Sequence, residues 1–141
     1  RSRWLGDVYK RQELDASDAA STTFVDLTGS TGLALYGRLE LPMNLWVAVV
    51  TAATLDENGG GSCPGGCGNH FGDTITLADA WACYWLPWSD FVQTSAEGTG
   101  YRESDFRQVA AIEFHPVSPS DGFDFWLDDV AILWDVAVDG A

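Results

Sequence analysis

Short segments dense in β-branched and aromatic residues recur along this chain, and each ends at glycine, proline or polar turn residues. Six segments share this pattern: residues 33–39, 45–54, 74–78, 80–88, 110–116 and 123–135. No segment keeps the 3.6-residue apolar period over the length of a helix, and we expect at most one helical turn, near Ser104–Gln108. Strands at this spacing predict an all-β fold, an antiparallel β-sandwich of the jelly-roll type.

The composition fits one compact domain and excludes several classes of protein. The chain has 141 residues, 46% of them hydrophobic, and seven tryptophans, which is unlike a disordered acidic segment. The net charge of −14 disfavours nucleic acid as a partner, because phosphate contacts require lysine and arginine. No apolar run approaches the ~20 residues that a membrane-spanning helix needs, so we expect no membrane partner.

The first twelve residues differ in charge from the rest of the chain. They contain four basic residues and one acidic residue, whereas the rest contains three basic and twenty acidic residues. The string LGDVYKRQ resembles translated sequencing-adaptor sequence, so we expect residues 1–12 to be a non-native segment that packs loosely or not at all. A genuine basic arm is the alternative. The domain is then residues 13–141, which we expect to be truncated at the N-terminus.

Strand alternation divides the side chains between a core and an outer face. The residues expected in the core are Val47, Val49, Phe114, Phe123, Phe125 and Leu127, with Trp46, Trp88 and Trp134. The residues expected on the outer face are Tyr36, Arg38, Trp81, Trp85, Glu113, His115, Asp124 and Trp126. Aromatic rings stack on the flat C–H faces of sugars, and charged groups hydrogen-bond with sugar hydroxyls. The outer set is therefore a candidate ligand-binding face.

Three sequence blocks occur in an order that resembles a known family. They are WACYWLPWSDF (residues 81–91), IEF (residues 112–114) and LDDV (residues 127–130). This order is similar to the C-terminal half of carbohydrate-binding modules of the family-11-like, galactose-binding-like jelly-roll group. The strings VDLTGSTGLALYGRL and LWVAVVTAAT resemble the preceding strands, so the resemblance covers about residues 24–135. The usual first strand of the family has no match here.

The resemblance implies a module that binds a polysaccharide such as β-glucan without catalysis. We expect it to be secreted and extracellular, as a monomer or as part of a larger secreted protein. The resemblance also implies a structural calcium beside Asp128 or Asp129. Because calcium takes six to eight oxygen ligands, one or two carboxylates are not enough, and we expect weak or absent binding.

Two other interpretations stay open. Glu113 and Asp124 fall in the same outer set and are a candidate acid/base pair, which makes a small glycoside hydrolase or other hydrolytic domain the first alternative. A purely structural sandwich without a ligand is the second. Asp128 and Asp129 are adjacent, so in a regular strand they point to opposite faces and do not form a catalytic pair.

Cysteine spacing predicts a disulfide. Cys63 and Cys67 flank a Pro-Gly-Gly turn, and a bond between them would close a five-residue loop. A zinc site of Cys63, Cys67, His70 and Cys83, or free thiols, are the alternatives. A disulfide indicates an oxidising, extracellular setting. Cys83 is then left over, either as a buried thiol or as a residue whose partner lies upstream of this sequence.

Overall fold

The computed structural model describes residues 2–5, 10–13, 22–40, 43–94, 102–117 and 124–135. Eight strands lie within these ranges: β1 (Ser2–Leu5), β2 (Lys10–Glu13), β3 (Ser30–Leu39), β4 (Met43–Thr51), β5 (Phe71–Leu77), β6 (Ala82–Pro87), β7 (Val109–Pro116) and β8 (Asp124–Trp134). Three short 3-10 helices accompany them: η1 (Glu57–Gly59), η2 (Trp88–Asp90) and η3 (Glu103–Arg107). The helical turn expected at Ser104–Gln108 corresponds to η3. None of the described helices is long and apolar enough to cross a membrane.

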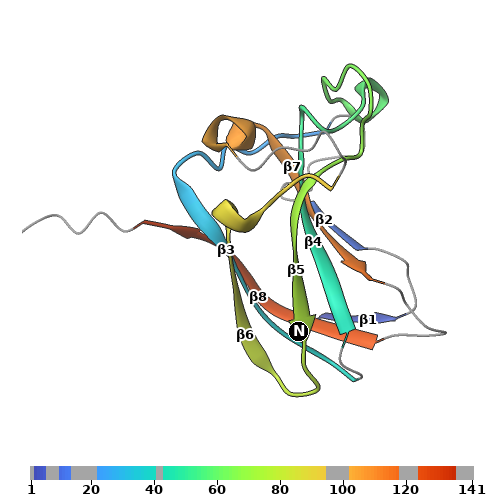
Figure 1. The fold of residues 1–141 in the computed structure, drawn as a ribbon, viewed down its shortest axis with the longest axis vertical. Coiled ribbons are helices and arrows are strands. Elements are labelled where there is room, and N and C mark those ends of the chain that lie inside the picture. Colours follow the sequence, from blue (N-terminus) through green and yellow to red (C-terminus); the bar gives the residue numbers. More distant parts are fainter. Residues whose placement is uncertain are drawn as a thin grey trace, which may run out of the picture.

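The strands form two antiparallel sheets that pack face to face (Figure 1). Sheet A has the strand order β1-β8-β3-β6, and sheet B has the order β2-β7-β4-β5. The glycine-rich loop that contains η1, together with η3, lies at the end of the sandwich drawn at the top in Figure 1. The predicted all-β antiparallel sandwich is therefore confirmed.

Alternation along each strand builds the core between the two sheets. Leu33 and Leu35 of β3 point inward from sheet A, while Val47 of β4 and Phe114 of β7 point inward from sheet B. Five of the predicted core residues are at most 4% exposed: Val47, Val49, Phe114, Phe125 and Leu127. Phe123 lies outside the described residues. These apolar side chains fill the space between the two sheets. The alternate side chains of each strand point outward and form the two outer faces of the sandwich.

One of the three tryptophans expected in the core is buried there. Pro87 ends β6, and η2 then turns Trp88 inward, where its ring contacts Phe91 and Phe106 edge-on at centroid distances of 5.0 Å. The Trp88 Nε1–H donates a hydrogen bond to Ser30 Oγ at 2.8 Å, which satisfies the polar edge of the buried indole. The aromatic residues of the PWSDF string thus belong to the core.

The other two tryptophans expected in the core do not lie there. Trp46 alternates with the inward-facing Val47, so it lies half-buried on the outer face of sheet B, over Gly72. Trp134 is the last residue of β8, opposite Ser30, and is 51% exposed. It lies at the end of the strand, where the facing sheet no longer covers it.

The described backbone includes two segments before residue 14. Ser2–Leu5 pairs with residues 124–127 of β8, and Lys10–Glu13 pairs with residues 111–114 of β7. The backbone of both segments thus pairs with a sheet edge, while the division of the chain after residue 12 stays a prediction. The physical reason is that the edge of a sheet offers unpaired N–H and C=O groups to any extended segment. The non-native origin of these residues stays a prediction.

The glycine-rich loop is closed by the predicted disulfide. Cys63 and Cys67 are bonded, with their Cα atoms 5.7 Å apart, so they are neither zinc ligands nor free thiols. Backbone hydrogen bonds anchor the loop on both sides, from Cys63 N–H to Leu55 O and from Gly68 N–H to Thr54 O. Cys83 occupies an outward position of β6 and is exposed, which excludes the buried thiol, one of the two alternatives for this residue.

Candidate functional site

The eight residues expected on one outer face lie on two opposite faces. Six of them lie on the outside of sheet A: Tyr36, Arg38, Trp81, Trp85, Asp124 and Trp126. Glu113 and His115 lie on β7, which belongs to sheet B, and face outward on the other side of the sandwich. Alternation sorts side chains correctly within each strand, but it does not say to which sheet a strand belongs.

We call the outside of strands β3, β6 and β8, together with Trp81, the sheet A face. Tyr36 lies at its centre, opposite Cys83 of β6 on one side and Asp128 of β8 on the other. Arg38 lies opposite Trp126, one outward position further along β3. Cross-strand neighbours of this kind bring side chains within contact distance.

Three rings and one cation form a stack on this face. Tyr36 and Trp81 are stacked, with ring centroids 5.0 Å apart and planes 17° apart. The Arg38 Cζ lies 4.3 Å from the Trp126 ring centroid and 6.0 Å from the Trp81 ring centroid. A guanidinium group at these distances is held by the electrons of both indoles. Trp81 and Trp126 therefore each have part of their ring surface covered by protein.

Trp85 is the open ring of the sheet A face. It is 66% exposed, and its partner on β3 is the small residue Ala34. A Cβ on Gly32 would lie 3.0 Å from Trp85 Nε1 and 2.6 Å from Leu86 O, so glycine at this position leaves room for the edge of the indole. The ring is thus supported from below while most of its surface stays open to solvent.

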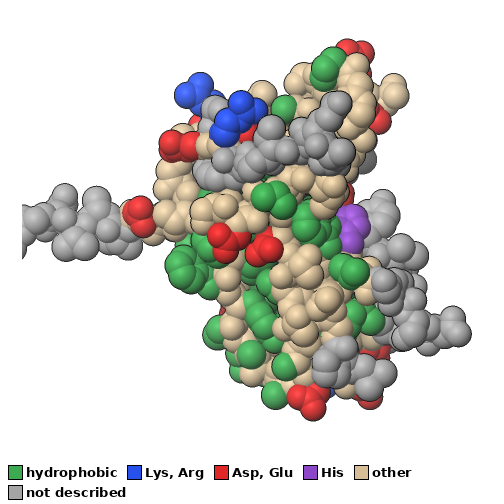
Figure 2. All heavy atoms as spheres, viewed as in Figure 1, with side chains coloured by type: hydrophobic (Ala, Val, Ile, Leu, Met, Phe, Trp, Pro, Cys, Tyr) green, Lys and Arg blue, Asp and Glu red, His purple; other side chains and the backbone are tan. Residues whose placement is uncertain are grey.

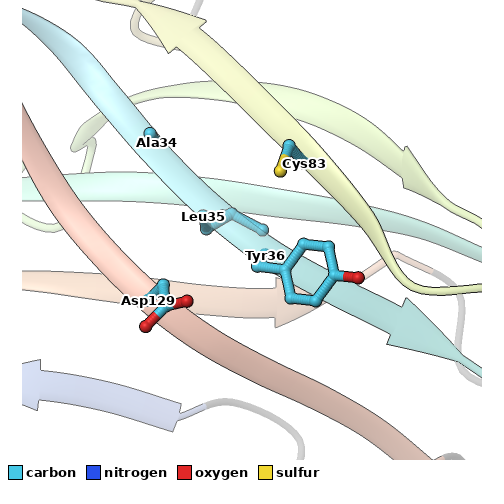
Figure 3. A pocket seen from close by; sticks show the side chains of 5 residues that line it. All are labelled: Ala34, Leu35, Tyr36, Cys83 and Asp129. Carbon is cyan, nitrogen blue, oxygen red and sulfur yellow. The ribbon is translucent and has the colours of Figure 1, made fainter.

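A β-bulge in β8 places the two adjacent aspartates on the sheet A face. Tyr36 pairs with Asp128 and Ala34 pairs with Ala131, so three steps on β8 face two steps on β3. Asp129 lies in this bulge and has a φ of 50°, in the left-handed region. Asp128 lies opposite the outward-facing Tyr36, and Asp129 lines a hollow beside the same ring (Figure 3). This corrects the expectation that the two carboxylates point to opposite faces.

The residues around this bulge do not fit the calcium site that the resemblance implied. No group of three or more His, Cys, Asp or Glu side chains suited to a metal ion occurs in the described part of the chain. Asp128 Oδ1 already accepts a hydrogen bond from Asp129 N–H at 3.2 Å. Two carboxylates fall well short of the six to eight oxygens that calcium takes. We therefore assign no metal to Asp128 and Asp129.

Glu113 and His115 interact with each other on the outer face of sheet B. Glu113 Oε2 lies 3.0 Å from His115 Nε2, and Glu113 is only 9% exposed. Asp124 lies on the outside of sheet A, so the whole sandwich separates it from Glu113. The acid/base pair considered for a glycosidase therefore does not form, because a glycosidase needs both carboxylates beside the same bond.

The sheet A face carries more negative than positive charge. Among the side chains that the structure describes there, Asp124, Asp128 and Asp129 lie along β8 and Arg38 is the cation. Figure 2 shows basic side chains gathered over η3, where Arg102 and Arg107 are exposed. Asp129 and Cys83 also belong to this face but are not among the eight residues expected there. Alternation places Cys83 correctly outward, whereas the bulge that turns Asp129 has no signal in the sequence.

Solved structures with a similar fold are family 11 carbohydrate-binding modules. One, from Clostridium thermocellum, is in complex with a β-1,3-1,4-mixed-linked tetrasaccharide; it is 12% identical, with a TM-score of 0.53 over 94% of this chain and 88% of that chain. A second, from a cellulosomal cellulase of Clostridium thermocellum, is 14% identical, with a TM-score of 0.55 over 94% of this chain and 86% of that chain. No protein-family model and no curated protein matches the sequence. The chain therefore has the β-sandwich fold of family 11 carbohydrate-binding modules.

Proposed function

We propose that this protein binds a polysaccharide on the sheet A face and does not cleave it. The observation that supports this most directly is Trp85, a tryptophan that is 66% exposed on a face with three further aromatic rings. Large exposed aromatic side chains on a flat face are typical of a binding surface, because a ligand that covers them removes apolar area from water. A sugar ring has the flat C–H face that suits an indole.

The ligand that we propose is a neutral β-glucan. The structure with a similar fold that contains a mixed-linked β-glucan tetrasaccharide supports this choice of sugar. Charge supports it as well, because among the described side chains of the face Asp124, Asp128 and Asp129 outnumber Arg38 and would repel a polymer of uronic acids. The affinity should be modest, since an open face leaves much of each sugar unit in water.

We further propose that the protein acts outside the cell, as a monomer or as part of a larger secreted protein. The Cys63–Cys67 disulfide supports an oxidising compartment. The separation of Glu113 from Asp124 supports binding rather than hydrolysis. A structural sandwich without a ligand is the interpretation that the following experiment must exclude.

The test is retention of Trp85→Ala on mixed-linked β-glucan in affinity electrophoresis. We expect the affinity to fall about thirtyfold, the factor for the ~2 kcal/mol of a central tryptophan in a binding surface. The matched control is Val117→Ala, which removes an exposed apolar side chain at the end of β7 in sheet B and should bind as the wild type does.

Two results would contradict the proposal. The first is wild-type retention by a folded Trp85→Ala variant, which would show that this face holds no glucan. The second is release of reducing sugar ends from soluble β-glucan by the wild-type protein, which would make it a hydrolase.

A further inference from the structure

A shallow hollow lies at the centre of the sheet A face, between β3, β6 and β8. Its volume is about 270 Å³, and it is lined by Ala34, Leu35, Tyr36, Cys83 and Asp129 (Figure 3). Ala34 and Cys83 have small side chains, which leaves a depression beside the larger Tyr36. The hollow is smaller than the pockets that enclose whole ligands, so it suits a substituent or one edge of a sugar unit.

Asp129 is the charged residue in the lining of this hollow. Its side chain is exposed at the bulge, and its backbone N–H donates to Asp128 Oδ1. Asp129 lines the hollow together with Tyr36, so its carboxylate lies next to the space that a ligand on this ring would occupy (Figure 3). An ionised carboxylate only accepts hydrogen bonds, so it suits a ligand group that donates them.

We propose that Asp129 determines which sugar the sheet A face selects, by accepting hydrogen bonds from a substituent seated in the hollow. This inference rests on the proposed binding of a polysaccharide to the same face. An ammonium substituent, as in β-1,4-linked glucosamine, should bind more tightly than a hydroxyl, because it adds a charge of opposite sign. A carboxylate substituent, as in a uronic acid, should be excluded, because two acceptors then meet without a proton between them.

Two substitutions at Asp129 separate its charge from its hydrogen bonds. Asp129→Asn removes the charge and keeps an acceptor oxygen, while Asp129→Gly removes the whole side chain. Both residue types adopt a φ of 50° more readily than others do, so both should preserve the bulge. Asp79→Asn, in the exposed turn between β5 and β6, makes the same change in net charge outside the lining of the hollow and is the matched control.

The experiment is calorimetric titration with three hexasaccharides: mixed-linked β-glucan, β-1,4-glucosamine and a galacturonate. We expect the wild type and Asp79→Asn to bind the glucosamine oligomer about fivefold more tightly than the glucan, the factor for one unit-charge pair near 4 Å in water. This preference should shrink in 0.5 M salt, which screens the charges. The galacturonate should bind more weakly than either.

The Asp129 variants then decide the assignment. Asp129→Asn and Asp129→Gly should each bind the two oligomers equally, and Asp129→Gly should bind the glucan about tenfold more weakly than the wild type, as expected for loss of a hydrogen bond to a charged group. Glucan binding that is the same in the wild type and both variants would overturn the role of Asp129 and leave the proposed function standing. Wild-type protein that binds none of the three oligomers would overturn both.

Discussion

The two outer faces of the sandwich contain similar residue types but differ in what their side chains contact. On the sheet A face, Trp85 is 66% exposed and lies beside a stack of rings around Arg38. On the outside of sheet B, Trp46 is half-buried over Gly72, and Glu113 is paired with His115 at 3.0 Å. The first face leaves apolar area open to a ligand, whereas the second face satisfies its own polar groups and covers its own ring.

A single position beneath each ring explains much of this difference. A Cβ on Gly72 would clash with the Trp46 ring, so glycine there lets the indole sink onto the sheet. Gly32 leaves room only for the edge of the Trp85 indole, and the rest of that ring remains exposed. Exposure of a tryptophan on a sheet therefore depends on its cross-strand neighbours as well as on its own position in the strand.

The largest expected effect is a difference in stability between substitutions of two tryptophans that are three residues apart. Trp88→Ala should lower the free energy of unfolding by about 3–5 kcal/mol, because it empties a core site that touches Phe91 and Phe106. Trp85→Ala should change it by less than about 0.5 kcal/mol, as exposed substitutions do. Chemical denaturation of both variants checks this. Equal destabilisation would mean that Trp85 is also a structural residue.

Removal of the disulfide should have a smaller effect on stability. Cys63→Ser should lower the free energy of unfolding by up to about 2 kcal/mol, because the bond closes a loop of five residues. Binding of β-glucan should not change, since neither cysteine lies on the sheet A face. Thermal unfolding and affinity electrophoresis of the same variant give the two measurements. Lost binding with an unchanged melting temperature would place part of the site in the loop.

Substitution of His115 tests whether the outer face of sheet B takes part in binding. His115→Ala should cost about 1 kcal/mol of stability, because Glu113 loses a hydrogen-bonding partner while it remains largely buried. Retention on β-glucan should match the wild type, since His115 lies on the other side of the sandwich. A folded variant with reduced retention would show that the glucan contacts sheet B.

The strands and much of the core follow from the sequence, because each depends on local alternation. Val47, Phe114 and Phe125 are buried as the alternation of their strands predicts. The face on which His115 lies does not follow from alternation, because strand order depends on pairings between residues far apart in the chain. The position of Asp129 does not follow either, since the bulge arises from the pairing of β8 with β3.

A nitrogen-15 NMR titration with a mixed-linked β-glucan oligosaccharide tests the central claim most directly. We predict that the amides of Ala34, Tyr36 and Cys83 and the indole N–H of Trp85 shift with added sugar. The amides of Trp46 and of the other outward residues of β4, β5 and β7 should stay in place, because they lie on the opposite face. If the largest shifts instead fall on those three strands, the glucan binds on sheet B and the sheet A face is not the binding site.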